Sequence, residues 1–275
     1  MEIVEKLSKR IDTLGKVYIK EQPDISPFGY MVEKVEPQVN VITHTIATMP
    51  VAYNVNDYDN EKGQTALNFV KSTVKSAIEK EDEVVGIATT VHTDLINQLA
   101  TTDDETDKLA STIVNSLIKG QTALRTKKVM DVLASIKKSI LSSEINLANL
   151  YNIIKNPKLF IEHNNDMFPT VYNQSDIVVV AKASKVSKLT PLDKPNNITS
   201  VINNDLPKVI VMPDEYFKDK TYAYIISKDT LKVYEKYITI EPQINAKYGF
   251  TNYFLRTRNT YFLNPFELAV KINEA

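Results

Sequence analysis

The chain has 275 residues, of which 43% are hydrophobic and 24% are charged, and its formal net charge is -1. This is the composition of an ordinary folded protein, and such a charge balance gives no broad basic surface for tight binding to a nucleic-acid backbone. The lack of cysteine excludes disulfides, zinc ribbons and thiol catalysis. The charged N-terminus does not resemble a signal peptide, and no stretch reaches the roughly 18 consecutive apolar residues of a membrane span. We therefore expect a soluble protein that folds in the cytoplasm.

The first 38 residues predict an N-terminal arm. Ile3, Leu7 and Ile11 recur at helical spacing and indicate a short amphipathic helix within residues 2–22. Three prolines between positions 23 and 37 then break any regular element. We expect an extended arm that cannot form a core alone; the alternative is a helix packed on its own domain.

Residues 39–62 predict a β-hairpin. The stretch VNVITHTIATMPVAYNV, which begins at Val39, is rich in Val, Ile and Thr and nearly alternates between two faces. Pro50 disfavours a central strand and suggests a sheet edge or a loop tip. Polar turn residues follow it.

A long helix is expected over residues 65–89. Hydrophobic residues recur there at helical spacing from Leu67 to Val85, with lysine and glutamate on the other side. At about 1.5 Å per residue this helix would be about 37 Å long. We expect it to be the structural spine of the fold.

Three further helices are expected after the spine. They cover residues 104–119, residues 122–141, and a short segment that Ser143 opens and that stops before Pro157. Thr102 or Asp103 caps the first of them, and Gly120 lies just beyond its end. Val129, Leu133, Ile136 and Ile140 form the buried stripe of the second.

The last hundred residues predict a series of closely spaced strands. Short apolar runs bounded by prolines or polar turns are typical of buried strands. The runs are residues 176–184, 207–213, 221–227, 231–242, 250–258 and 266–272. The order of arm, hairpin, helices and mixed strands indicates an α+β chain.

The sequence contains no recognisable catalytic motif. Its three histidines, His44, His92 and His163, are far apart and lack the spacing of metal ligands. KGQTALRTKK, residues 119–128, lacks the second glycine and the preceding strand of a phosphate-binding loop. We therefore predict no catalytic residue, no cofactor and no metal site, and we do not expect an enzyme. An α+β enzyme of unrecognised type is an alternative, because Asp, Lys and Tyr can catalyse without a motif.

Two acidic clusters have structural explanations. DDETD, residues 103–107, suits the positive end of a helix dipole, and a divalent cation is the alternative reading. Glu81, Asp82 and Glu83 lie near the end of the expected spine helix. A solvated face explains them, and a contact with another subunit is the alternative.

Arg256 and Arg258 are candidates for a contact between subunits. They lie two residues apart on one face of a predicted strand, opposite Tyr253, Leu255 and Thr257. That position suits the binding of a carboxylate from a neighbouring chain. A plain exposed strand is the equal alternative.

The order of elements resembles that of the tailed-bacteriophage major capsid proteins, which have the Hong Kong 97-type fold. VKSTVKSAIEKEDEVVGIATT resembles the end of the family's spine helix, where an acidic pair precedes a short apolar stretch and a glycine, here Gly86. The closing pattern of the family is similar to IVVVAKAS, a short helix, KVIVMPDEYF, TYAYIIS and the strand pair in TNYFLRTRNTYFLNPFELAVKI.

The resemblance implies a division of the chain into five segments. Residues 1–38 would be the N-terminal arm, 39–62 the β-hairpin called the E-loop, 63–150 the spine helix with the helical part of the peripheral domain, 151–220 an axial-type domain, and 221–275 the closing strands of the peripheral domain.

The resemblance also implies a function. The protein would be a major capsid protein that self-assembles into an icosahedral shell around double-stranded phage DNA. Its partners would be copies of itself in hexamers and pentamers, scaffolding and portal proteins, and packaged DNA through weak, non-specific contacts, with no membrane. It would be assembled in the host cytoplasm and located in the virion capsid. An encapsulin-type bacterial nanocompartment shell protein and a non-shell phage structural protein are alternatives.

Overall fold

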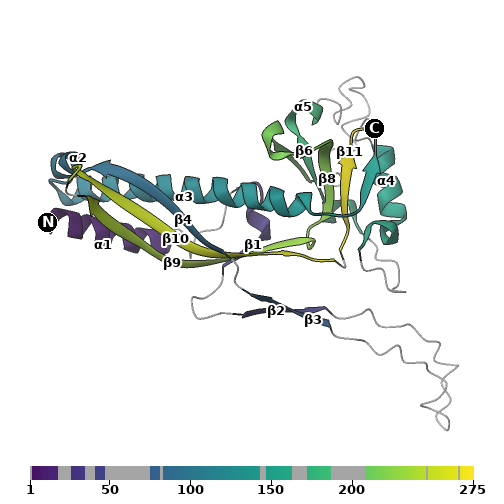
Figure 1. Cartoon of the computed structure of the whole chain (residues 1–275), viewed down its shortest axis with the longest axis horizontal. Helices are drawn as coiled ribbons and strands as arrows, with labels where there is room; N and C mark the ends of the chain where they lie inside the picture. The colour runs from purple at the N-terminus through teal and green to yellow at the C-terminus, as the bar shows by residue number, and fades with distance from the viewer. Residues whose placement is uncertain are drawn as a thin grey trace, which may run out of the picture.

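The computed structural model describes residues 2–17, 26–34, 41–46, 75–80, 83–142, 147–162, 172–186, 208–245, 247–265 and 267–275. These residues form an α+β fold, as predicted, with two larger β-sheets and a two-stranded sheet. The longest described helix, α3 (Asp103–Ala134), connects the two larger sheets (Figure 1).

The other helical elements are short. The α-helices are α1 (Glu2–Lys16), α2 (Thr93–Leu99), α4 (Leu147–Lys155) and α5 (Ala183–Val186). The 3-10 helices are η2 (Gly29–Met31), η4 (Pro157–Phe160), η5 (Gln174–Asp176) and η6 (Asp214–Tyr216). No helix of the described residues combines the length and the apolar character needed to cross a membrane.

The first sheet is a long, four-stranded ribbon in the order β1-β9-β10-β4. Its strands are β1 (Val32–Lys34), β9 (Leu231–Asn245), β10 (Phe250–Leu263) and β4 (Glu83–His92). Ile240, Tyr253 and Leu255 on one face are buried against α1 and α3. In the turn between β9 and β10, Gly249 has φ 66°, a conformation that favours glycine.

The second sheet has five strands in the order β5-β11-β8-β6-β7. They are β5 (Ser139–Leu141), β11 (Ala269–Asn273), β8 (Thr221–Ser227), β6 (Ile177–Lys182) and β7 (Lys208–Met212). Every residue of β8 is buried, because the sheet has a hydrophobic cluster on each face. The predicted strands of residues 176–275 are thus all present, although β10 and β11 lie in different sheets.

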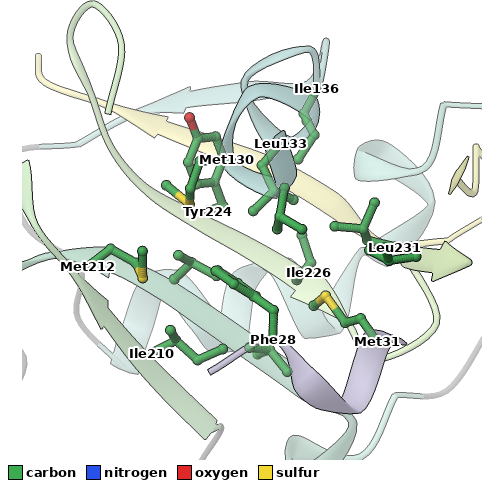
Figure 2. Close-up of a cluster of buried hydrophobic side chains, with 14 of the residues drawn as sticks. Phe28, Met31, Met130, Leu133, Ile136, Ile210, Met212, Tyr224, Ile226 and Leu231 are labelled. Atoms are coloured by element: carbon green, nitrogen blue, oxygen red, sulfur yellow. The ribbon is translucent and has the colours of Figure 1, made fainter. Parts of the chain in front are cut away.

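One of these clusters joins the second sheet to α3 and to the N-terminal region. Figure 2 shows Met130 and Leu133 of α3 beside Tyr224 and Ile226 of β8, with Phe28 nearby. The rings of Tyr224 and Phe217 stack with their centroids 5.7 Å apart. This packing fixes the C-terminal end of α3 on the sheet.

The remaining strands form a separate hairpin-like pair. β2 (Val41–Ile46) and β3 (Lys75–Lys80) are antiparallel, with Val41 opposite Lys80. Figure 1 shows this pair extending away from the two larger sheets. The prediction of a strand after Val39 is confirmed, and the rest of the predicted 39–62 hairpin lies outside the described residues.

The predicted helix over residues 65–89 is wrong wherever the structure describes that segment. Residues 75–80 form β3 and residues 83–92 form β4. From Gly86 to His92 the exposure of the side chains alternates, which is the period of a strand. Pairing with β2 and β10 overrides the helix propensity of the lysine- and glutamate-rich stretch KSAIEK.

The two helices expected on either side of Gly120 are one continuous helix, α3, which ends at Ala134. The expected helix up to residue 141 is wrong at its end, because Ser139–Leu141 form β5 beside β11. Thr102 caps it as predicted and forms a capping box with Glu105. Gly120 does not end the helix; a Cβ at that position would lie 2.7 Å from Cγ2 of Ile87 on β4. The glycine therefore allows close contact between α3 and the ribbon. The short helix before Pro157 is confirmed as α4.

The N-terminal helix α1 packs into a hydrophobic cluster of its own chain, so the expectation of an extended arm is wrong for this helix. Val4, Leu7 and Ile11 of α1 are buried together with Val114 and Leu117 of α3. The alternative prediction, a helix packed on its own domain, is therefore correct for α1.

Candidate functional site

The candidate site begins with the outer face of β10, where Arg256 and Arg258 lie. Tyr253, Leu255 and Thr257 on the opposite face are fully buried, so the predicted orientation of this strand is confirmed. Arg256 is exposed and Arg258 is less so. A register shift in the pairing with β9 occurs between Arg256 and Thr257, where Ile238 of β9 is the extra residue.

Arg256 has a carboxylate partner within its own chain. Its Nη2 lies 3.4 Å from Oε2 of Glu241 on β9, and about half of each side chain is exposed (52% and 49%). An exposed ion pair of this kind contributes about 0–1 kcal/mol. Glu241 therefore stabilises the position of Arg256 weakly, and a carboxylate from another chain can compete with it.

Of the predicted acidic candidates, the structure describes only the backbone of Glu83. Glu81 and Asp82 lie outside the described residues. Glu83 begins β4 opposite Asn259, three positions along the strand from Gly86, which is opposite Arg256. Whether any of these residues contacts a neighbouring subunit stays a prediction.

The acidic start of α3 binds to α1. Lys6 forms an ion pair with Asp103, and Nε of Arg10 lies 3.3 Å from Oδ1 of Asp107. The hydrogen bond and charge of Lys6 hold the pKa of Asp103 below its ordinary value. This cluster joins two helices, and the described residues include no group of three or more His, Asp or Glu side chains that could hold a metal ion.

The histidines are not brought together in the part of the chain that the structure describes. His92 ends β4, with its Nδ1 3.7 Å from Oδ2 of Asp94, and is largely exposed. His44 lies in β2, and His163 lies outside the described residues. KGQTALRTKK, which was rejected as a phosphate-binding loop, lies inside α3.

Residues 119–128 contribute to a buried polar network that the sequence did not predict. Nη1 of Arg125 lies 3.0 Å from Oε2 of Glu235, and their side chains are only 4% and 1% exposed. Nε2 of Gln121 donates hydrogen bonds to Oε1 of Glu235 at 2.9 Å and to Oγ1 of Thr257 at 2.7 Å. The network joins α3 to both long strands of the ribbon.

The position of this network explains its role. Buried residues recur along α3 at every fourth position, namely Ile113, Leu117, Gln121, Arg125, Val129 and Leu133. The two polar residues lie between the hydrophobic cluster under the ribbon and the one under the five-stranded sheet. Their i, i+4 spacing on the buried stripe was the available signal, but their partner Glu235 is 110 residues away from Arg125 in the sequence.

A cleft of about 300 Å³ lies at the C-terminal half of α3 and is lined by Lys127, Met130, Asp131, Glu215, Tyr216 and Lys218. Nζ of Lys218 lies 2.6 Å from Oδ1 of Asp131. Nearby, burial raises the pKa of Tyr224 to about 12, with Asp219 and Asp131 adding to the shift. A tyrosine with so high a pKa stays protonated at neutral pH and is a poor base.

Neither the family models nor the curated proteins include a match to this sequence. Solved structures do match. The capsid structure of Staphylococcus phage Andhra contains a chain with 13% identity and a TM-score of 0.58, over 92% of this chain and 86% of that chain. A chain from the structure of the head fiber and inner core protein gp22 of native bacteriophage P68 matches at 13% identity and a TM-score of 0.57, over 90% of this chain and 84% of that one. The virus-like particle from Pyrococcus furiosus matches at 13% identity and a TM-score of 0.53, over 98% of both chains.

At such low identity these matches show the fold. The chain has the fold of chains found in phage capsid structures and in a virus-like particle. The resemblance to tailed-phage capsid proteins predicted from the order of elements is therefore confirmed as a resemblance of fold.

Proposed function

We propose that this chain is a major capsid protein, many copies of which assemble into an icosahedral shell around double-stranded phage DNA. The observation that carries the proposal is the extent of the fold match: 92% of this chain and 86% of the capsid chain of phage Andhra. A match of that extent concerns the whole architecture and not a shared motif. The role is structural, not enzymatic.

In this proposal the parts of the fold have separate roles. α3 takes the place of the spine helix, because its 32 residues extend for about 48 Å and pack on both larger sheets. The ribbon with α1 forms the peripheral domain, the five-stranded sheet the axial-type domain, and β2–β3 the base of the E-loop. The closing segment 221–275 contributes β9 and β10 to the peripheral domain and β8 and β11 to the axial-type domain.

The proposed partners are further copies of the chain in hexamers and pentamers, with scaffolding and portal proteins during assembly in the host cytoplasm. The formal net charge of -1 suits weak, non-specific contact with the packaged DNA, because a shell that bound phosphates tightly would hold the duplex in place. The mature protein would lie in the virion capsid.

A second candidate function is supported by a separate observation. The virus-like particle from Pyrococcus furiosus matches over 98% of both chains, so a shell protein of an encapsulin-type nanocompartment is the second candidate. The contents of the particle distinguish the two functions. Particles from the natural source that contain a long DNA duplex support the capsid, and particles filled with one cargo enzyme support the compartment.

Assembly of the purified full-length chain tests the proposal. We expect light scattering to detect particles of many copies, and negative-stain microscopy to show closed outlines of uniform diameter. The chain should be studied alone and co-expressed with the products of adjoining genes. A chain that stays monomeric in both preparations, up to its solubility limit, would contradict the proposed function.

A further inference from the structure

The outer edge of β4 has the features of a surface that pairs with another strand. β4 is the last strand of the order β1-β9-β10-β4, so only its β10 side is paired within the described residues. It is ten residues long, and its pairing with β10 runs from Glu83 to His92 without a register shift. The edge is therefore long and regular.

The sequence of this edge lacks the usual protection against pairing. Exposed sheet edges are normally blocked by lysine, proline, a bulge or a very short strand. EVVGIATTVH contains no lysine, arginine or proline, and its one carboxylate, Glu83, is at the end. The other outer strands of the two larger sheets differ, since β1 and β5 have three residues each and β7 has five and begins with Lys208.

Side chains of β4 at the edge of the hydrophobic cluster are only partly buried. On the helix-covered face, Leu255 and Tyr253 of β10 are fully buried. Their direct neighbours on β4, Ile87 and Thr89, are only partly buried. Ile87 is an apolar residue packed at the rim of the cluster beneath the ribbon. A further strand on the outer side of β4 would complete this burial.

The exposed face of β4 leaves room for a close neighbour. Gly86, Ala88 and Thr90 are exposed there, and a Cβ added at Gly86 would meet no atom within 4 Å. A glycine inside a strand lowers its stability, and it often marks a site where another backbone approaches closely. Among the described residues no steric demand explains Gly86.

We propose that β4 pairs antiparallel with β4 of a second copy of the chain, about a two-fold axis at Ala88, so that the two ribbons form one continuous sheet. The inference rests on the proposed function, in which copies of the chain contact one another in a shell. It assigns one of those contacts to a named strand.

Charge favours the antiparallel direction for pairing between two copies of β4. Antiparallel pairing about Ala88 places Val84 of one copy opposite His92 of the other, and the two copies of Glu83 lie at opposite ends of the paired segment. Parallel pairing would set Glu83 against Glu83, and like charges directly opposite are destabilising. The axis at Ala88 also leaves Glu83 outside the paired residues 84–92, whereas an axis at Ile87 would place it opposite Val91.

A cysteine at Ala88 tests the pairing directly, because the chain has no cysteine of its own. Directly opposite residues of antiparallel strands have Cβ atoms about 4.5–5.5 Å apart, close to disulfide geometry. With copper phenanthroline as oxidant, two thiols of the Ala88→Cys variant should form one disulfide. We expect a dimer fraction about tenfold above that of Ser116→Cys, because pairing holds the thiols at a roughly millimolar effective concentration. Ser116 is exposed on α3 and provides the matched control.

Hydrogen exchange of the β4 amides and microscopy of the same samples separate the outcomes. Shells in which Ala88→Cys cross-links and the β4 amides become protected support the pairing. Shells in which cross-linking stays at the control level overturn it, whether the amides are exposed or are protected by some other segment. Disulfide dimers without shells would uphold the pairing and contradict the proposed function, and monomers without dimers would contradict both.

Discussion

Arg125 and Glu235 are buried in the middle of the molecule, where α3 crosses the ribbon. Removing a charge from water costs several kcal/mol, and an ion pair with good geometry and further hydrogen bonds offsets that cost. Gln121 supplies one of those bonds by donating to Glu235. The pair is therefore expected to fix where α3 lies on the ribbon more than to add net stability.

Substitution of one partner tests this interpretation. Arg125→Met should lower the free energy of unfolding by about 3–5 kcal/mol, because it leaves the Glu235 carboxylate buried without its guanidinium. The double variant Arg125→Met/Glu235→Leu should recover most of the loss, since a well-packed apolar pair replaces the ions. Urea denaturation of the isolated subunit measures both. A single variant as stable as the wild type would show that the pair is not needed in the folded subunit.

Gly120 has a different role, which is to leave space. Alanine has the higher helix propensity by about 1 kcal/mol, so Gly120→Ala would stabilise an isolated helix. In the protein the new Cβ would lie 2.7 Å from the γ-methyl of Ile87, and overpacking of this kind costs about 1–3 kcal/mol.

We therefore predict that Gly120→Ala lowers the thermal midpoint, as measured by circular dichroism. Ile87→Ala removes the clashing methyl, so the double variant should be more stable than the sum of the two single effects predicts. Gly86→Ala is the matched control, because its Cβ meets nothing within 4 Å and should leave stability unchanged or raise it. An increase in the midpoint for Gly120→Ala would contradict the close contact.

At the scale of elements, α1 is a helix that contributes to the core of its own chain. Leu7 and Ile11 are fully buried, whereas Ile3 is 38% exposed. Ion pairs from Lys6 and Arg10 to the start of α3 add to this contact, though each is exposed and weak. The segment is thus ordered without a neighbouring subunit.

Leu7→Ala should therefore destabilise the free subunit by about 2–5 kcal/mol, the usual cost of removing a buried leucine side chain. Ile3→Ala on the exposed side of the same helix should change the free energy by less than about 0.5 kcal/mol. Denaturant unfolding of both variants gives the comparison. If Leu7→Ala left unfolding unchanged, α1 would be an arm that needs a neighbour for its order.

Local signals predicted the elements that depend on local sequence. The apolar runs from residue 176 onward form strands bounded by turns, and β6 and β8 among them are buried on both faces. Thr102 caps α3 through a contact three residues away. The helix prediction was wrong for residues in the stretch 75–92, because these residues form strands that pair with β2 and β10, which are far away in the sequence. The role of Gly120 and the partners of Arg125 could not be predicted for the same reason, because both depend on contacts with strands that are distant in the sequence.

At the scale of the whole molecule, one long helix joins two of the three hydrophobic clusters formed by the described residues. The ribbon and α1 surround one core, and the five-stranded sheet, η2 and the end of α3 surround the other. Exposed surface on the ribbon lies on the face away from the helices, where Gly86, Ala88 and Arg256 are found. Contacts between copies that involve this face would leave both cores undisturbed.

The arginines of β10 give the last prediction. The double variant Arg256→Glu/Arg258→Glu should lower the yield of shells, because it reverses the charge offered to carboxylates of a neighbouring subunit. The charge reversal at Arg256 should change the thermal midpoint of the free subunit little, since Arg256 is 52% exposed and its ion pair with Glu241 is weak. Nε of Arg258 is buried, so the single variant Arg256→Glu is compared with the double variant. Glu241→Gln removes that internal pair without adding a negative charge, so it should keep the wild-type yield. Particle counts by microscopy, set against circular dichroism of the subunits, separate assembly from folding. An unchanged shell yield in the charge-reversed variant would show that these arginines form no contact that assembly needs.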